Sequence, residues 1–148
     1  MANLARAYLI FLVAFYPLTA LTEETDATAI TQTVVAYCDA WSEPDAAKRT
    51  SLLNQTWSSE GTYTDPTAHV EGRDALNVHI GKFFEQYPGA KILVSSKVDA
   101  HHHRFRFAWR MVTADGATAL EGMDYGELDG NGRIKRIVGF FGPLAAPS

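Results

Sequence analysis

Two stretches in the second half of the chain alternate between apolar and polar residues. Residues 104–112 read Arg-Phe-Arg-Phe-Ala-Trp-Arg-Met-Val, and residues 119–128 read Ala-Leu-Glu-Gly-Met-Asp-Tyr-Gly-Glu-Leu. A period of two residues predicts a strand in each stretch. Asp115-Gly116 between them predicts a two-residue hairpin turn, because such turns favour residues that tolerate positive φ. This turn places Phe107 opposite Asp124.

The charged residues support this register. It pairs Arg110 with Glu121 and Arg104 with Glu127 on one face, and a slip of one residue would break both pairs. A charged face of this kind fits either a solvated surface or the interface of a homodimer. The residues expected on this outer face are Arg104, Arg106, Arg110, Glu121, Tyr125 and Glu127.

A third strand is expected at residues 133–141, after a two-residue turn at Gly130-Asn131. That turn pairs Asp124 with Ile137, so the carboxyl of Asp124 lies on the inner, apolar face between Phe107 and Ile137. A carboxyl in such surroundings must find a partner, become neutral or face a cavity. Two interpretations stay open: an aspartate that reaches water at a sheet edge, or a functional residue in a cavity.

Helical periodicity dominates the first half of the chain. Residues 29–42 place Ile30, Val34, Tyr37 and Trp41 on one face. Tyr37 on that face fits either a core aromatic or a site residue. The elements that follow are a helix over 44–54, a short strand over 61–65 that is ended by Pro66, and a helix over 72–87.

A further strand is expected over 91–99, with a tight turn at Ala100-His101 that pairs Val94 with Phe107. The run His101-His102-His103 suggests a metal site, but successive side chains of a strand alternate between faces. We therefore interpret the run as a cluster at a loop edge, with His103 near the mouth of a cavity, and expect no metal and no other cofactor.

The order of elements is helix, helix, short strand, helix and a meander of four strands, which is typical of an α+β fold. Three amphipathic helices then cover the inner face of a strongly curved sheet and leave a pocket at its open end. The aromatic residues expected to face this pocket or border it are Trp41, Tyr63, His79, Phe105, Phe107, Trp109 and Phe141.

Composition limits the class of protein. The chain has 148 residues, 47% of them hydrophobic, and a net charge of −4, which argues against nucleic acid as a partner. Cys38 is the single cysteine, so no internal disulfide forms. The aromatic inner face of the expected pocket makes a small hydrophobic molecule the expected partner.

Residues 1–22 are typical of a secretory signal peptide, because Arg6 precedes an apolar run over 7–21 that is short for a transmembrane helix. We expect a secreted or periplasmic protein with no membrane span in the mature chain. There are two alternatives: the segment is an uncleaved membrane anchor, or its start is misassigned and the protein is cytoplasmic. Residues 23–28 are a polar lead-in, 29–144 one domain and 145–148 a tail. In a glycosylating compartment Asn54-Gln55-Thr56 is an acceptor sequence.

Two motifs add a family resemblance. The step Tyr63-Thr64-Asp65-Pro66 followed by Gly72-Arg73, and the segment Asp129-Gly130-Asn131-Gly132-Arg133-Ile134, resemble the nuclear transport factor 2-like (NTF2-like) superfamily. Within it, the chain is similar to the SnoaL-like polyketide cyclase and steroid Δ-isomerase branches over residues 29–144. The resemblance implies a cone-shaped fold with three helices packed on a curved, mostly antiparallel sheet.

The resemblance to ketosteroid isomerases also implies site residues. Tyr37, Asp65 and Asp124 stand where that family has a tyrosine, a carboxylate base and a protonated aspartate that stabilises an enolate. Trp57 and the His79-Ile80 pair occupy places where the family has supporting tyrosines. Ala108 and Gly139 fall where limonene epoxide hydrolases carry carboxylates, which argues against that activity.

The sequence therefore leaves three functions open. The first is an isomerase- or cyclase-type enzyme that transfers protons beside a carbonyl, with Asp65, Asp124 and Tyr37 as catalytic residues. The second is a non-catalytic module that binds a hydrophobic molecule. The third is a domain that binds a partner through the outer face of its sheet. Two acids in an apolar pocket favour the enzyme, because a carrier does not need them.

Overall fold

A computed structural model describes residues 18–147 of the chain as three helices and a mixed sheet of seven strands. The helices are α1 (Leu18–Ala40), α2 (Ala46–Thr56) and α3 (Arg73–Gln86). The strands are β1 (Trp57–Thr64), β2 (His69–Glu71), β3 (Lys91–Val94), β4 (Asp99–His101), β5 (Arg104–Val112), β6 (Thr118–Leu128) and β7 (Ile134–Phe141).

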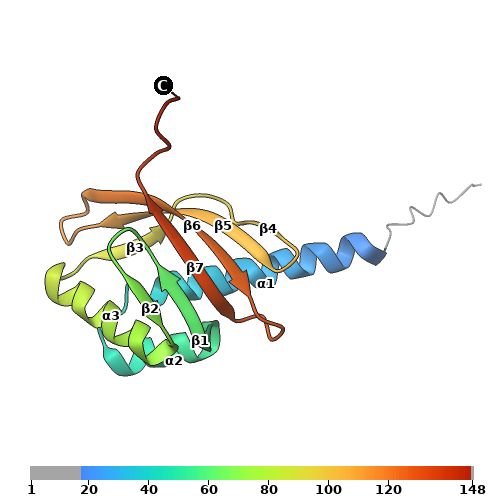
Figure 1. The fold of residues 1–148 in the computed structure, drawn as a ribbon, viewed down its shortest axis with the longest axis horizontal. Helices are drawn as coiled ribbons and strands as arrows, with labels where there is room; N and C mark the ends of the chain where they lie inside the picture. Colours follow the sequence, from blue (N-terminus) through green and yellow to red (C-terminus); the bar gives the residue numbers. More distant parts are fainter. Residues whose placement is uncertain (1–17, 148) are drawn as a thin grey trace, which may run out of the picture.

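The helices lie together on one side of the curved sheet (Figure 1). Helix α1 packs against α2 and lies along β3 and β4. Its predicted apolar face is confirmed, because Ile30, Val34, Tyr37 and Trp41 are all buried. Loss of contact with water by such side chains is the main favourable contribution to folding.

Helix α1 begins at Leu18 rather than Ala29, so the expected lead-in over 23–28 is helical. Most of the expected targeting segment lies outside the described residues, and its last five residues form the start of this helix. Within residues 18–147, no helix is both long and apolar enough to cross a membrane.

The strand order is β2-β1-β7-β6-β5-β3, and β4 also pairs with β5. Strand β1 runs parallel to β7, while the other neighbours are antiparallel. The parallel pairing places the end of β1, which Asp65 follows, beside β7. Strand β7 is also the neighbour of β6, which carries Asp124. The α+β class and the mostly antiparallel sheet are as predicted.

The predicted register of β5 and β6 is confirmed over most of the hairpin. Phe107 lies opposite Asp124, and the Arg104–Glu127 and Arg110–Glu121 positions face each other. Only the turn differs: Val112 pairs with Thr118, and a bulge absorbs one residue.

The predicted register of β6 and β7 is wrong by two residues. Asp124 lies opposite Gly139 instead of Ile137, which pairs with Gly126. The turn is wider than predicted, because Asp129 N–H bonds to the Arg133 carbonyl at 2.7 Å and a bulge follows Glu127. An even shift keeps every side chain on its predicted face, so Asp124 still points inward.

The predicted strand over 91–99 is divided into β3 and β4, and its predicted register is wrong. Val94 pairs with Trp109 rather than Phe107. The Ser96 hydroxyl accepts a hydrogen bond of 2.8 Å from the Ala108 N–H and so replaces a backbone partner where the strand is interrupted. The hairpin then turns at His102 and His103.

Helices α2 and α3 are joined by Arg49, a buried charged residue that the sequence pattern did not reveal. Its guanidinium donates to Asn77 Oδ1 at 2.6 Å and to the carbonyls of Glu43 and Pro44 at 2.9 and 3.2 Å. It also lies over the Phe84 ring, 5.7 Å from the centroid. These contacts fix α3, which forms one wall of the cavity described next.

Candidate active site

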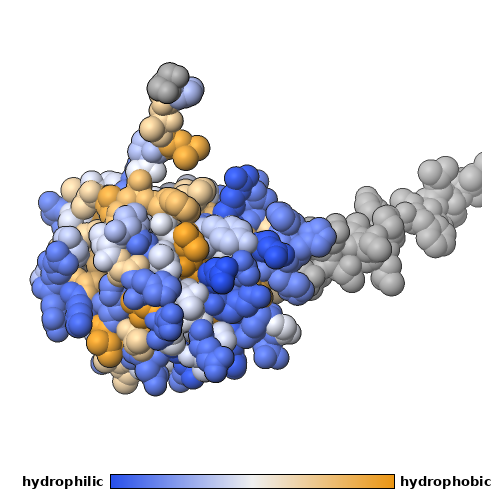
Figure 2. Space-filling view, in the orientation of Figure 1, coloured by the Kyte–Doolittle hydropathy of each residue, from blue (hydrophilic) through white to orange (hydrophobic). Residues whose placement is uncertain are grey.

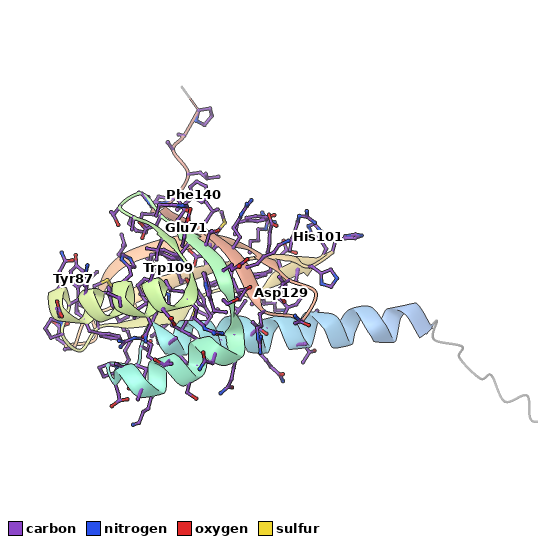
Figure 3. All side chains as sticks on the ribbon, turned by 60° about the horizontal axis from the view of Figure 1, so that its bottom comes forward. Glu71, Tyr87, His101, Trp109, Asp129 and Phe140 are labelled. Atoms are coloured by element: carbon purple, nitrogen blue, oxygen red, sulfur yellow. The ribbon has the colours of Figure 1, made fainter. Side chains whose placement is uncertain are left out.

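A cavity of about 410 Å³ lies between the helices and the sheet. Most of its lining is aromatic or aliphatic, and two carboxyl groups face it. Trp109, in the middle of the domain in Figure 3, contributes to its wall, and Tyr87 borders the same cavity at the end of α3. The lining residues are Tyr37, Cys38, Trp41, Tyr63, Asp65, Thr67, His79, Lys82, Phe83, Gln86, Tyr87, Ile92, Trp109, Met111, Leu120, Asp124 and Phe141.

Asp124 is the buried acid of this cavity, with 5% of its surface exposed. The indole N–H of Trp109 donates to its Oδ1 at 2.7 Å. Burial raises the pKa of Asp124 to about 7, although the Trp109 bond lowers it; the negative charge of Asp65 raises it further. The carboxyl is therefore poised to give or take a proton near neutral pH.

Asp65 is the second acid, on the loop that follows β1. Its Oδ1 accepts hydrogen bonds from Thr67 N, Thr67 Oγ1 and Ala68 N at 2.6, 2.8 and 2.7 Å. Its Oδ2 accepts one from the Tyr63 hydroxyl at 2.7 Å. Burial raises the pKa of Asp65, but these four bonds outweigh burial and bring it below its ordinary value. This carboxyl is therefore ionised at neutral pH.

Gly139 allows the two acids to share one site. A Cβ atom at this position would lie 3.0 Å from Asp124 Oδ1 and 3.5 Å from Asp65 Cβ. Both acids thus approach a single point on β7 that carries no side chain. No local sequence pattern indicates Gly139 as this neighbour, because the β6–β7 register depends on the length of the turn at 129–133.

Tyr37 lies on the helical wall, stacked on Trp57 with ring centroids 5.5 Å apart. Burial and the nearby Asp124 raise the pKa of its hydroxyl well above the ordinary value, so the phenol stays neutral. A neutral phenol beside a cavity can donate a hydrogen bond to an oxygen that gains charge.

His79 completes an aromatic cluster on the other side of the cavity. Its ring lies 5.8 Å from that of Trp41 and 5.7 Å from that of Tyr63. Burial lowers the pKa of His79, Asp65 raises it and Lys82 lowers it, with a net lowering. The imidazole is therefore neutral above its ordinary pKa and presents polar nitrogens in a largely apolar wall.

Eight of the predicted site residues meet at this cavity, and three do not. His103 lies at the opposite end of the domain, which corrects its predicted place near the cavity mouth. Phe105 and Phe107 are buried in the core, and the Phe105 ring covers Gly126. The eight residues that line the cavity are Tyr37, Trp41, Tyr63, Asp65, His79, Trp109, Asp124 and Phe141.

Some lining residues were missed by the sequence analysis. Lys82, Phe83 and Gln86 follow His79 on α3 at spacings of three, four and seven, so they share its face. This helical spacing could have identified them. Within residues 18–147, no group of three or more His, Cys, Asp or Glu side chains is placed to hold a metal ion.

Comparison with known proteins identifies the family. The chain is 32% identical to a SnoaL-like family protein from Agrobacterium tumefaciens strain C58, with a TM-score of 0.73 over 80% of this chain and 99% of the other. The chain belongs to the SnoaL-like family, within the NTF2-like fold. No family model and no curated protein matches it.

Two further structures share the fold at lower identity. One is a protein of unknown function with a cystatin-like fold from Methylobium petroleophilum PM1, with 19% identity and a TM-score of 0.65 over 81% of this chain and 80% of that one. The other, from Jannaschia sp. CCS1, bears a SnoaL-like polyketide cyclase name, with 16% identity and a TM-score of 0.61 over 77% and 85% of the two chains. At this level of identity the likeness shows only the fold, because one fold can carry unrelated functions.

Proposed function

We propose that this protein is an acid–base enzyme that moves a proton beside the carbonyl group of a small apolar compound, in an isomerase- or cyclase-type reaction. One observation carries the proposal. Two carboxyl groups share an apolar cavity, and their surroundings displace their pKa values in opposite directions. Such a pair supplies a base and an acid at the same pH.

The roles follow from the hydrogen bonds. Asp65 is ionised, and its Oδ2, whose one hydrogen bond comes from the Tyr63 hydroxyl, takes a proton from the carbon next to the carbonyl. The electron pair of the broken C–H bond moves to the carbonyl oxygen and forms an enolate. Asp124 in its protonated form donates to that oxygen, and Tyr37 supplies a second donor.

The reaction ends when Asp65 returns the proton to a different carbon in an isomerisation. In a cyclisation the enolate carbon instead attacks a second carbonyl of the same molecule, and the proton held by Asp65 passes to the resulting alkoxide, so that both acids return to their starting states. In both cases the apolar walls exclude water, which strengthens the interactions with the developing charge. The names of the Agrobacterium and Jannaschia proteins, isomerase and cyclase, are consistent with these two outcomes.

The test is turnover of a panel of steroid-like and polycyclic carbonyl compounds by the wild-type chain and three variants. Asp65→Asn should abolish turnover while the quenching of Trp109 fluorescence still reports binding. Asp124→Leu should weaken the binding of phenols that mimic an enolate. Asp99→Asn, at an exposed aspartate paired with Arg106, is the matched control and should behave as wild type. Full activity of Asp65→Asn on a compound that the wild type converts would refute the acid–base roles.

A non-catalytic binding module is the second candidate, and a specific observation favours it. All four hydrogen bonds to Asp65 come from its own segment, between Tyr63 and Ala68, which is what a purely structural turn residue shows. If the wild-type chain binds members of the panel saturably and converts none, the binding module replaces the enzyme.

A further inference from the structure

A second cavity, of about 550 Å³, lies at the other end of the domain from the candidate active site. Figure 3 shows His101 at this end, projecting from the tip of the β4–β5 hairpin, and Tyr87 at the opposite end. One side of the cavity is the exposed histidine run, and the other sides are α1 and the turn between β6 and β7. Its lining consists of Ala27, Ala29, Ile30, Thr33, Ala100, His101, His102, His103, Leu128 and Gly132.

The turn at this tip has an unusual backbone. His102 and His103 both have positive φ, 49° and 60°, although neither is a glycine. Two positive φ values are the requirement of the hairpin turn that normally carries Asn-Gly, and a side chain in this region costs about 1–2 kcal/mol per residue. The two histidines therefore stand at the turn positions where a hairpin of this kind normally carries residues that tolerate positive φ.

The turn brings adjacent histidine side chains to the same side, contrary to the strand alternation expected from the sequence. His101 is the last residue of β4, and His102 already has the left-handed backbone, so strand alternation ends between them. The two rings therefore come together, with centroids 5.6 Å apart and Nδ1 atoms 3.4 Å apart.

This separation is long for a hydrogen bond between the two nitrogens, whose usual length is about 2.9–3.0 Å. It matches a shared metal ion well. Two imidazole nitrogens at about 2.0–2.1 Å from a tetrahedral Zn²⁺ ion are roughly 3.3–3.4 Å apart. A wider N–metal–N angle, or the longer metal–ligand bonds of Ca²⁺ sites, would place the two nitrogens further apart. Hard cations such as Ca²⁺ also prefer oxygen ligands to imidazole.

We propose that the β4–β5 hairpin tip binds a divalent transition-metal ion, Zn²⁺ by preference, through Nδ1 of His101 and Nδ1 of His102. Both rings are exposed, so an ion reaches them without rearrangement of the fold. Water fills the remaining coordination positions, because the described residues supply no third carboxylate, thiolate or imidazole within a preformed group. The site is separate from the acids of the candidate active site and does not depend on their proposed chemistry.

The experiment is calorimetric titration of the full chain with ZnCl₂ in a chelator-free buffer. The wild-type protein should bind one ion at this tip, and His101→Asn should weaken that binding by at least about tenfold, the smallest loss usual for a disturbed metal site. His102→Asn should do the same, and asparagine tolerates the left-handed backbone, so the turn is kept.

His69→Asn is the matched control, since His69 is also an exposed histidine and contacts a carboxylate, Glu71, at 3.2 Å. It should leave the tip's affinity for Zn²⁺ unchanged. Circular dichroism checks that each variant is folded. The proposal fails if the wild type shows no saturable binding, or if binding persists in both tip variants.

Discussion

The indole N–H of Trp109 and Oδ1 of Asp124 form a 2.7 Å hydrogen bond across the β5–β6 hairpin. Trp109 is itself paired with Gly122, so its ring reaches along the inner face toward the carboxyl two residues further on. The absence of a side chain at Gly122 makes room for this ring, since a Cβ there would collide with the indole of Trp109. This bond favours the ionised form of an otherwise desolvated acid.

Replacing Trp109 with phenylalanine should therefore destabilise the protein more at alkaline than at acidic pH. Asp124 binds its proton more tightly in the folded than in the unfolded chain, so its contribution to stability is full below about pH 4 and is lost as pH rises through about 7. Trp109→Phe raises this pKa further. In urea denaturation, the decrease in the free energy of unfolding caused by Trp109→Phe should be larger by about 1–2 kcal/mol at pH 8.5 than at pH 5. Equal losses at both pH values would contradict the coupling.

Gly139→Ala should impair the site while the fold persists. The new methyl group would lie between the two acids and press on Asp124 Oδ1 at 3.0 Å, so that this carboxyl must move. Displacement of a reacting group by part of an ångström costs about tenfold in rate, and we expect at least that loss in turnover or in the affinity for an enolate-like phenol. Gly130→Ala is the control, because nothing lies within 4 Å of its Cβ position. Similar behaviour of the two variants would argue against a shared site.

Arg49→Met should destabilise the domain by about 2–4 kcal/mol. The change leaves the Asn77 amide oxygen and the Glu43 carbonyl without their charged donor in a partly buried position. Thermal unfolding measures the loss, and Lys48→Met, one residue earlier on α2 at an exposed position, should change stability by less than about 0.5 kcal/mol. A comparable effect of the two substitutions would show that the buried contacts of Arg49 contribute little.

The outer face of the sheet is proposed as the surface of a homodimer. Met123 and Phe140 pair across β6 and β7 on this face and are 36% and 54% exposed. Glu127 forms ion pairs there with Lys135 and Arg136, at 3.5 and 3.6 Å, although Arg104 is the residue directly opposite on β5. In Figure 2 hydrophobic residues reach the surface along the sheet, below the C-terminal tail. An apolar centre with a charged rim is the usual anatomy of an interface.

Light scattering tests this surface. The wild-type chain should show twice the monomer mass, and Phe140→Lys should shift it toward the monomer. Val78→Lys, at a residue of α3 that is 60% exposed, is the control and should leave the mass unchanged. A monomer mass for the wild type over a wide range of concentration would remove the proposal.

The sequence predicted those parts of the fold that depend on periodicity. The buried face of α1 follows from side-chain spacing, and the β5–β6 register from alternation, the Asp115-Gly116 turn and the charge pairs; together they place Tyr37, Trp109 and Asp124 correctly on the inner side of the fold. The prediction failed where turn length decides the outcome. The turns at 129–133 and at His102-His103 gave β7 and β4 registers that no local pattern indicated.

The candidate site shows the same division. The sequence predicted the inward direction of Asp124, because a register shift of two residues leaves a side chain on the same face of the sheet. It did not predict that Gly139 lies opposite Asp124 on β7. The four hydrogen bonds that hold Asp65 depend on the conformation of its own loop. The partners of Arg49 lie on α3 and in the segment before α2. Neither a loop conformation nor a contact between two helices can be derived from a local sequence pattern.

Carboxyl ¹³C NMR titration measures directly whether Asp65 and Asp124 hold opposite protonation states in one cavity. Spectra of the wild-type chain, assigned with Asp65→Asn and Asp124→Asn, give the pKa of each group. Asp124 should titrate at about 7, while Asp65 stays ionised to below the ordinary pKa of an aspartate. A pKa of about 4 for Asp124, the ordinary value of this side chain, would show that the two acids do not differ in protonation and would rule out the proposed acid–base pair.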